Sequence, residues 1–513
     1  MPQTVHAAPL AGSPVLIVGA GLMGAGIAQV AAEAGHPVIL HDLRAGAAAA
    51  ARDGIARALA ALVAKGRREP AAVEATLARI VPADTLDAGA DLAAVRLVVE
   101  AIVEQLPAKQ ALLRDLEARV GADCILATNT SSISVTAIAR GLRQPERVVG
   151  MHFFNPVPAM KLVEVVSGLA TAPAVADAVF ALAGAWGKTA VHARSTPGFI
   201  VNRIARPYYA EALALLQVRA ATPAAIDACL RGAGFRMGPC ELMDLIGHDT
   251  NLAVTESVHA ANYFDRRYVP SRLQREMVDG GWLGRKSGRG FYSYPEGAAA
   301  APAPAMPEAP APPADAPLCV HGRGPVAERW RAALAAAGRD ATARPASDWT
   351  GLEIGAAALR LALTDGRTAA RLGPGWALHD ELPVDPGGTL AWSVAPQAQD
   401  AVAQAVPGWL GLLGVRPQQV GDAPGLVVAR TLAMLVNEAA DAVEEGVCSE
   451  DGADAAMTLG LNWPAGPFAW RARLGAARVV ALLEALDAQC RGERYRVNPA
   501  LRALAQWPVA APA

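Results

Sequence analysis

Residues 14–26 read PVLIVGAGLMGAG, and this stretch decides the fold of the first part of the chain. A short β-rich run leads into a G-x-G-x-x-G turn, an Ala-rich helical stretch follows to about Ala34, and a second apolar run ends at Asp42. A strand, a glycine-rich turn, a helix, a strand and an acidic residue within about 30 residues are the context that a dinucleotide-binding fold requires. The sequence therefore predicts a doubly wound α/β domain.

The glycines of this turn have separate physical roles. Gly19 permits the tight turn, Gly21 lets the backbone approach a pyrophosphate, and Gly24 lets the helix pack close to the strand. The N–H groups at the helix N-terminus then favour the anionic pyrophosphate. We expect Asp42 to accept hydrogen bonds from the adenosine ribose and to repel a 2′-phosphate, so NAD is favoured over NADP, with Arg44 nearby as the counter-argument. The alternative is a glycine-rich turn without a ligand.

Two further strands are predicted over Leu97–Val103 and Cys124–Ala127, and each enters polar residues at its carboxyl end. Glu104 follows the first, and Thr128–Ser132 follows the second. Ligands of an open parallel sheet bind outside the carboxyl ends of its strands, so we expect these residues to approach the glycine turn. Lys109, in the next predicted helix, would reach a cofactor ribose or phosphate. Read alone, the Thr/Ser cluster favours an N-cap for the following helix over a ligand contact.

Residues 151–166, MHFFNPVPAMKLVEVV, read as two short strands joined by a proline-containing turn. If the arms pair about this turn, His152 and Glu164 lie opposite one another, within reach of a side-chain hydrogen bond. An unpartnered carboxylate on this apolar face would be costly, and an imidazole is its obvious partner. A histidine held by a carboxylate suits a general base near neutral pH. The alternative is a hydrogen-bonded core histidine.

Composition excludes several classes of protein. The chain has 513 residues, which is more than one hydrophobic core, so we expect three or four domains. Its residues are 53% hydrophobic and 18% charged, and the net charge of −2 indicates neither a nucleic-acid footprint nor an acidic tail. Six scattered cysteines without a CxxC pair argue against a disulfide framework or a zinc site and favour a cytoplasmic location. The apolar run Val15–Ala32 contains recurring glycines and has no preceding basic residue, so we expect no membrane segment.

The second half repeats part of the first. Pro424–Arg430, PGLVVAR, mirrors Pro197–Arg203, PGFIVNR, with Ala429 in the place of Asn202. A worn dinucleotide-type segment precedes the repeat, and no histidine–glutamate counterpart is visible near Trp392, so we expect a scaffold there. The predicted order is a Rossmann-type domain, an all-α domain, a linker, a degenerate α/β segment and a second all-α copy, with boundaries at 13–196, 197–295, 296–316, 317–421 and 422–513.

Six motifs together resemble the L-3-hydroxyacyl-CoA dehydrogenase family. They are GAGLMGAG (19–26), VVEAIVE (98–104), TNTSS (128–132), HFFNPVPAMKLVEVV (152–166), TPGFIVNR (196–203) and GPCELMDLIG (238–247). The duplicated tail resembles the family's long bacterial branch, whose members act on 3-hydroxybutyryl-CoA or, in phenylacetate breakdown, 3-hydroxyadipyl-CoA. Nothing in the chain resembles a hydratase module.

The resemblance implies NAD-dependent, reversible oxidation of a (3S)-3-hydroxyacyl-CoA to a 3-ketoacyl-CoA, with no metal. It implies that His152 is the catalytic base, Glu164 its carboxylate partner, and Ser131 and Asn202 active-site hydrogen-bond donors. The implied cofactor contacts are Gly19, Gly21, Leu22, Met23, Gly24, Ala25, Gly26, Asp42, Glu104, Lys109, Ser131 and Asn155.

Helical modules of this family pair between subunits, so we expect either a homo-oligomer or pairing of the two copies within one chain. The rival functions are oxidation of a free hydroxy acid or sugar acid, and a binding scaffold without turnover.

Overall fold

The computed structural model describes residues 10–86, 92–295, 311–313, 315–355 and 359–506. Its contacts divide the chain into two compact units. The first unit comprises residues 1–203 and 442–461, and the second comprises residues 204–441 and 462–513. Most of the linker expected over 296–316 lies outside the described residues.

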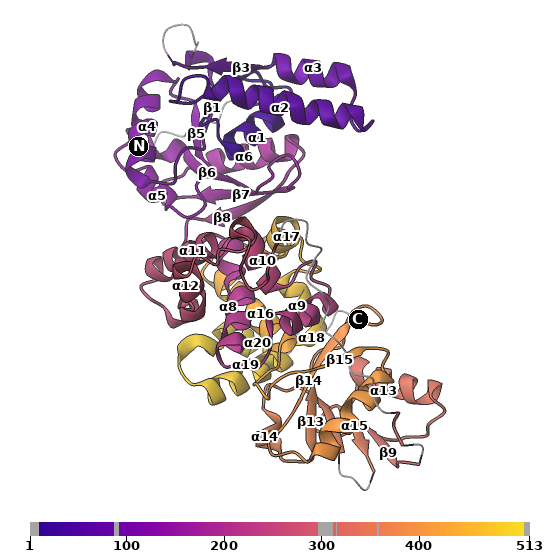
Figure 1. The fold of residues 1–513 in the computed structure, drawn as a ribbon. Coiled ribbons are helices and arrows are strands. Elements are labelled where there is room, and N and C mark those ends of the chain that lie inside the picture. Colours follow the sequence, from indigo (N-terminus) through magenta and orange to yellow (C-terminus); the bar gives the residue numbers. More distant parts are fainter. Residues whose placement is uncertain (1–9, 87–91, 296–310, 314, 356–358, 507–513) are drawn as a thin grey trace, which may run out of the picture. The chain divides into compact units, whose positions relative to one another are not determined.

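The first unit contains an eight-stranded sheet with the order β3-β2-β1-β4-β5-β6-β7-β8 (Figure 1). All neighbouring strands pair in parallel except β6 and β7, which form an antiparallel hairpin. The strands are β1 (Val15–Val18), β2 (Val38–His41), β3 (Ile80–Ala83), β4 (Leu97–Glu100), β5 (Ile125–Thr128), β6 (Val148–Phe153), β7 (Leu162–Ser167) and β8 (Thr189–Arg194). The helices are α1 (Leu22–Glu33), α2 (Ala47–Ala64), α3 (Pro70–Ala78), α4 (Leu106–Arg119), α5 (Val135–Ile138), α6 (Pro173–Ala185) and α7 (Val201–Ile204), with 3-10 turns η1 (Leu92–Ala94) and η2 (Pro145–Arg147).

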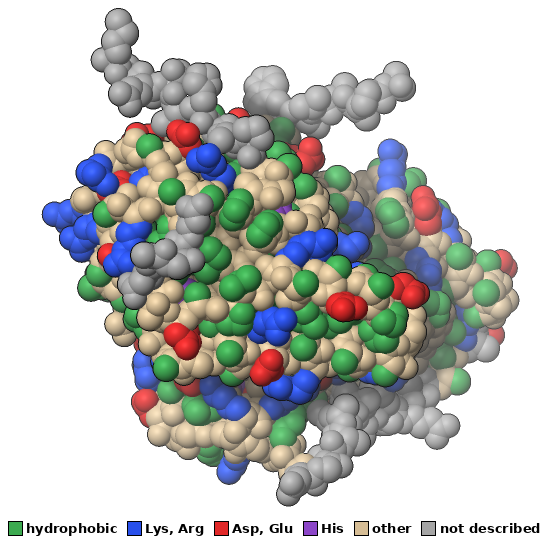
Figure 2. All heavy atoms as spheres, turned by 90° about the horizontal axis from the view of Figure 1, so that it is seen from above, with side chains coloured by type: hydrophobic (Ala, Val, Ile, Leu, Met, Phe, Trp, Pro, Cys, Tyr) green, Lys and Arg blue, Asp and Glu red, His purple; other side chains and the backbone are tan. Residues whose placement is uncertain are grey.

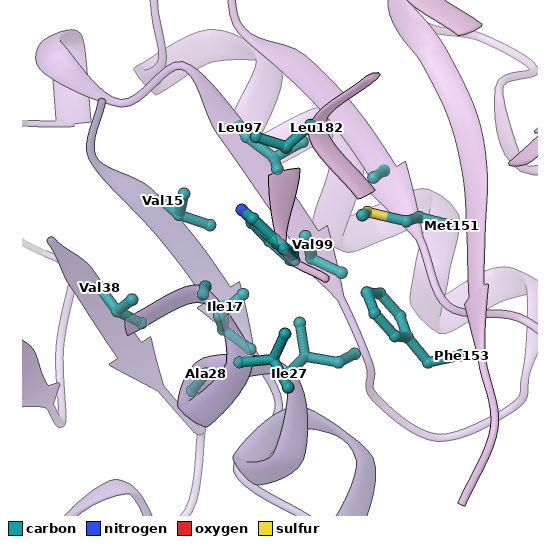
Figure 3. Packing of buried hydrophobic residues seen from close by; sticks show 14 of the residues in the cluster. Val15, Ile17, Ile27, Ala28, Val38, Leu97, Val99, Met151, Phe153 and Leu182 are labelled. Carbon is teal, nitrogen blue, oxygen red and sulfur yellow. The ribbon is translucent and has the colours of Figure 1, made fainter. Parts of the chain in front are cut away.

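The central strands are continuous apolar runs because helices cover the sheet. Ile17, Val99 and Met151 lie on one face of the sheet and pack against Ile27 of α1 and Leu182 of α6 (Figure 3). All five side chains are at most 4% exposed. Burial of such side chains contributes about 1.5–3 kcal/mol each to folding. This core holds the carboxyl ends of the strands, where the predicted site residues lie, in fixed register.

The predicted doubly wound α/β fold of this region is confirmed, with small differences at element ends. The strand expected over Leu97–Val103 stops at Glu100, because the Glu100 carboxylate is buried and turns the chain by accepting the N–H of Ile102 at 2.7 Å. The predicted all-α domain begins with two short helices, α7 and α8 (Arg206–Gln217), with a proline in the first turn of α8.

The second unit contains a seven-stranded mixed sheet with the order β10-β9-β11-β12-β13-β14-β15. It repeats the order of β2-β1-β4-β5-β6-β7-β8, but the strand in the place of β4, β11, is antiparallel to both of its neighbours. The elements are β9 (Leu318–His321), α13 (Pro325–Ala336), β10 (Thr342–Arg344), β11 (Gly351–Ile354), β12 (Leu359–Leu363), α14 (Ala369–Leu372), β13 (Trp376–His379), β14 (Thr389–Val394), α15 (Asp400–Gly411) and β15 (Arg416–Gln419).

Helices from both copies of the repeat make up the rest of the second unit. The first copy supplies α8, α9 (Pro223–Gly232), α10 (Pro239–Ile246), α11 (His248–Ala261), η3 (Arg266–Tyr268), α12 (Arg272–Asp279) and η4 (Arg285–Ser287). The second copy supplies α16 (Val428–Glu444), α18 (Pro467–Leu474), α19 (Ala476–Cys490), η5 (Glu493–Tyr495) and α20 (Pro499–Gln506). Helix α17 (Glu450–Leu461) of the second copy belongs instead to the first unit.

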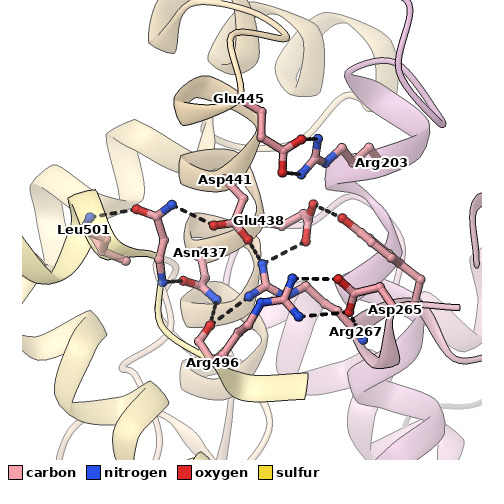
Figure 4. Close-up of polar contacts among 11 residues, drawn as sticks. Arg203, Asp265, Arg267, Asn437, Glu438, Asp441, Glu445, Arg496 and Leu501 are labelled. Carbon is pink, nitrogen blue, oxygen red and sulfur yellow. Dashed lines mark hydrogen bonds and ion pairs between the residues drawn. The ribbon is translucent and has the colours of Figure 1, made fainter. Parts of the chain in front are cut away.

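The two helical copies contact each other through buried charged groups. Glu211 of the first copy accepts hydrogen bonds from Arg430 (2.8 Å) and Arg494 (2.7 Å) of the second. Glu438 of the second copy accepts a hydrogen bond of 2.5 Å from Tyr268 of the first (Figure 4). Both glutamates are fully buried, and burying either carboxylate without these partners would cost folding free energy. Each copy thus donates hydrogen bonds to a buried glutamate of the other, as expected when two repeats pair about an approximate two-fold axis.

The molecular surface has charges of both signs. On the face that Figure 2 presents, Lys and Arg side chains are interspersed with Asp and Glu. Within the part of the chain that the structure describes, no helix has the length and apolar character needed to cross a bilayer.

Candidate active site

The β6–β7 hairpin brings together the two side chains on which the predicted chemistry depends. His152 and Glu164 are Cα partners in the antiparallel register, as the spacing predicted. His152 Nδ1 lies 2.5 Å from Glu164 Oε2. Glu164 is 0% exposed and His152 is 6% exposed, and the imidazole is flanked by the rings of Phe154 and Phe199. The pair therefore sits in an apolar enclosure that excludes most water.

The second oxygen of Glu164 is held by the backbone of the segment leading into α7. Glu164 Oε1 accepts the N–H groups of Ile200 at 3.0 Å and of Val201 at 2.9 Å. N–H groups at the start of a helix have no intrahelical partner, so a carboxylate satisfies them. The carboxylate is thus fixed at both oxygens, which fixes the position of the ring of His152.

The glycine turn has the geometry that a dinucleotide needs. Gly19 has φ +103°, and a Cβ at this position would lie 2.5 Å from the carbonyl oxygen of Ala101. A Cβ at Gly24 would lie 1.7 Å from the carbonyl oxygen of Gly19, which shows how closely α1 approaches the turn. A Cβ at Gly21, by contrast, would meet nothing within 4 Å, so the space beside this residue is open. Open space at the N-terminus of a buried helix suits a pyrophosphate.

Asp42 lies beside this turn at the end of β2. Its Oδ2 accepts the N–H of Ala20 at 2.8 Å, which ties it to the glycine turn. The Arg44 side chain hydrogen-bonds the carboxylate and, with two backbone N–H groups, holds the pKa of Asp42 well below its ordinary value despite partial burial. Asp42 is therefore ionised, and a carboxylate at this position suits ribose hydroxyl groups.

Glu104 gathers the polar residues that follow β5. Its Oε1 accepts the hydroxyl of Thr130 at 2.6 Å and the N–H of Ser131 at 2.9 Å, and its Oε2 lies 3.1 Å from Lys109 Nζ. Burial raises the pKa of Glu104. The Thr130 hydroxyl and the Lys109 ammonium together lower this pKa by more than burial raises it, so it lies below its ordinary value. The carboxylate thus holds the Thr/Ser loop in place.

Lys109 lies deeper than the sequence suggested. The side chain is 1% exposed, and its ammonium lies 2.7 Å from Glu100 Oε1. Glu100 also accepts the hydroxyl of Thr128 at 2.6 Å. Glu100 is not among the predicted site residues, although a carboxylate at the carboxyl end of a predicted buried strand was the available signal. This buried network orders the ends of β4 and β5.

The remaining predicted residues lie around the same edge of the sheet. Asn202 Nδ2 donates to the backbone oxygen of Ser131 at 3.4 Å, which places these two residues together. Asn155 is exposed in the hairpin turn. Asn129, which sequence reasoning passed over, accepts the N–H of Phe153 at 2.9 Å and so links the Thr/Ser loop to the strand of His152.

Comparison with known proteins identifies the family. A sequence model described as the NAD-binding domain of 3-hydroxyacyl-CoA dehydrogenase matches residues 14–196, and one described as the C-terminal domain matches residues 198–294 and again 425–511. The chain belongs to the 3-hydroxyacyl-CoA dehydrogenase family. The predicted NAD cofactor, the oxidoreductase class and the repeated C-terminal domain are thereby confirmed.

Individual relatives agree with this assignment. The 3-hydroxyadipyl-CoA dehydrogenase of Escherichia coli K12 is 43% identical over 493 residues, covering 95% of this chain and 96% of the relative. The crystal structure of 3-hydroxybutyryl-CoA dehydrogenase from Escherichia coli K12 superposes with a TM-score of 0.87 at 42% identity, over 97% of this chain and 99% of that one. A probable 3-hydroxybutyryl-CoA dehydrogenase of Bacillus subtilis is 43% identical over 55% of this chain and 97% of its own length.

The second sheet of this dehydrogenase carries a changed version of the hairpin. His379 occupies the place of His152 in β13, but its register partner in β14 is Trp392 instead of a carboxylate. Asp380 accepts the N–H groups of Val427 and Val428, as Glu164 does at α7. His379 was not predicted as the counterpart of His152, because the second hairpin differs in length and residue type. His379 is fully buried, and burial lowers its pKa to about 4.

Proposed function

We propose that this dehydrogenase oxidises short-chain or dicarboxylic (3S)-3-hydroxyacyl-CoA substrates, such as 3-hydroxybutyryl-CoA or 3-hydroxyadipyl-CoA, reversibly to 3-ketoacyl-CoA. The observation that carries the residue assignment is the 2.5 Å contact between His152 Nδ1 and Glu164 Oε2 on the cofactor domain. The choice of substrates rests on the names of the Escherichia coli relatives. A 3-hydroxyadipyl-CoA substrate would suit a role of this dehydrogenase in phenylacetate breakdown.

His152 is the base in this proposal. A carboxylate only accepts hydrogen bonds, so the proton of a neutral His152 lies on Nδ1, facing Glu164, and Nε2 presents a lone pair. Nε2 takes the proton of the substrate 3-hydroxyl group, and Glu164 stabilises the resulting imidazolium. Ser131 and Asn202 donate hydrogen bonds to the substrate oxygen atoms and orient them toward Nε2.

The glycine turn from Gly19 to Gly26 and the carboxylate of Asp42 would hold NAD, which supplies the hydride acceptor when bound. Glu104, Ser131 and Asn155 complete the cofactor contacts in this proposal. The burial of Lys109 suggests that it acts on the cofactor through Glu104, whose carboxylate it holds, and not by direct contact.

His152→Gln tests the assignment of the base. We expect kcat for NADH-dependent reduction of acetoacetyl-CoA to fall by at least about 10²-fold, because general acid–base catalysis is typically worth 10²- to 10⁴-fold. NADH binding, measured by fluorescence titration, should be unchanged. Normal turnover by this variant would overturn the assignment.

A substrate panel separates the rival functions. The panel consists of C4 to C16 3-ketoacyl-CoA thioesters and 3-oxoadipyl-CoA. We expect the reduction rate to fall with chain length in the monocarboxylic series. A dehydrogenase of free acids would instead reduce acetoacetate, or oxidise gulonate, faster than the thioesters. A scaffold without turnover would be stabilised thermally by NADH without oxidising it.

We further propose that the molecule has one active site and that residues 317–421 serve as a scaffold. Trp392 stands where a carboxylate would be needed, and the ring of His379 is fully buried. The contacts between Glu211 and Arg430 and between Glu438 and Tyr268 support pairing of the helical copies within one chain. We also propose a cytoplasmic location, on the scattered cysteine positions alone.

A further inference from the structure

A short segment of the second half of the chain belongs to the compact unit that holds the active site. Residues 442–461 group with residues 1–203, and α17 packs against β7 and β8. A Cβ at Gly460 would lie 2.7 Å from a methyl carbon of Leu162 and 3.2 Å from one of Val201, so this helix touches both the strand of Glu164 and helix α7. The N–H of Arg194 in β8 donates to the carbonyl of Val447 at 2.9 Å.

Within this segment, Glu445 holds the side chain of Arg203. The two Nη atoms of the guanidinium lie 2.6 and 2.9 Å from the two carboxylate oxygens, a bidentate pair (Figure 4). The Arg203 side chain is 4% exposed, whereas that of Glu445 is 56% exposed. Bidentate arginine–carboxylate pairs fix geometry as well as charge. Glu445 therefore sets the direction of a largely buried arginine.

Arg203 is placed where its orientation affects the catalytic residues. It lies on α7 next to Asn202, whose amide reaches the backbone of Ser131. The same short helix begins at Val201, and the N–H groups of Ile200 and Val201 fix Glu164. A helix of four residues has little rigidity of its own, so a side-chain clamp on it constrains the groups that it carries.

The first copy of the repeat has no carboxylate at the position that corresponds to Glu445. In the register that aligns Arg203 with Arg430 and Glu211 with Glu438, Glu445 falls opposite Val218, which is 70% exposed. Arg430, the counterpart of Arg203, pairs with Glu211. The two copies thus differ at the position of this carboxylate. The second copy has it, and α17 of this copy packs against β7 of the hairpin that carries His152 and Glu164.

We propose that Glu445 is a positioning residue for the dehydrogenase reaction, acting through Arg203 on α7 and so on Glu164 and Asn202. This inference rests on the catalytic roles proposed above for those residues. It also gives the second half of the chain a part in catalysis although that half contributes no residue to the chemistry.

The test compares Glu445→Gln with Glu445→Asp in the full-length enzyme. We expect E445Q to lower kcat with acetoacetyl-CoA by roughly ten- to a hundredfold, because small displacements of catalytic groups have effects of this size. The dissociation constant of NADH and the melting temperature should stay unchanged, and E445D should recover most of kcat. Asp115→Asn is the control for loss of a surface carboxylate, because Asp115 is 51% exposed, close to Glu445, and accepts two hydrogen bonds from Arg119 at 3.0 and 2.8 Å on the surface of α4.

Four outcomes would overturn the proposal. E445Q with wild-type kcat would show that the pair does not position anything, and an equal loss in D115N would show a general effect of lost surface charge. A loss of kcat together with a lowered melting temperature, not recovered by E445D, would assign the pair to stability. His152→Gln is measured beside these variants: if it is active, the proposed catalytic roles fail, and the positioning role fails with them.

Discussion

Glu164→Gln is the substitution whose outcome the hydrogen bonds of the active site define most sharply. Oε1 of Glu164 accepts two backbone N–H groups, and Oε2 accepts from His152. A glutamine has one acceptor oxygen, and the two backbone donors, which cannot rotate, require it at the position of Oε1. The NH2 group of the glutamine then faces Nδ1. Two donors cannot share a hydrogen bond, so the neutral ring adopts the tautomer with its proton on Nε2.

The altered tautomer removes the base, because Nε2 no longer has a lone pair for the substrate hydroxyl. A carboxylate-to-amide exchange behind the histidine of a serine protease lowers kcat about 10⁴-fold for this reason. We expect a fall in kcat of about 10³- to 10⁴-fold for E164Q, with the loss of a charge-assisted hydrogen bond lowering the free energy of unfolding by about 1–3 kcal/mol.

The assay follows the formation of NADH from NAD with 3-hydroxybutyryl-CoA at saturation, the direction in which Nε2 accepts the proton, beside urea denaturation and NADH fluorescence titration. Glu117→Gln is the matched control, since this buried carboxylate also accepts two backbone N–H groups, from Arg143 at 2.9 Å and Gln144 at 3.0 Å, but has no histidine partner. The control should lose stability and keep kcat. If E164Q keeps kcat within about threefold of the wild type, or if E117Q loses as much, the tautomer argument is refuted.

Two further predictions concern the glycine turn and the second sheet. Gly21→Ala should weaken NADH binding by at least about tenfold at an unchanged melting temperature. Gly24→Ala places a Cβ against Gly19 and should lower both the NADH affinity and the melting temperature. Equal melting temperatures for the two variants would contradict this. Burial lowers the pKa of His379 from 6.5 to about 4, so below pH 6.5 the unfolded chain binds a proton that the folded chain does not, and stability falls as the pH drops toward 4. His379→Leu should therefore remove about 2 kcal/mol of the loss in unfolding free energy between pH 7 and pH 5, and an unaltered pH dependence in urea denaturation would exclude this role.

The interactions that sequence reasoning could predict are those set by local periodicity. The strand, glycine turn and helix of residues 14–34 follow from adjacent residues, and the pairing of His152 with Glu164 follows from the alternation of a short hairpin. In both cases the partners are close along the chain, so few alternative arrangements compete. The repeat could also be predicted from the sequence, because its two copies keep matching residues such as Arg203 and Arg430.

Only the tertiary structure decided which side chains are buried and which distant groups meet. Lys109 is buried between the carboxylates of Glu100 and Glu104, and His379 faces Trp392 because the second hairpin has its own register. The pair of Arg203 and Glu445 joins positions separated by 242 residues, and residues 442–461 leave the rest of their repeat to pack against β7 and β8. Sequence periodicity shows which face of a helix or strand is buried, but the partner of that face depends on packing and loop closure over the whole chain.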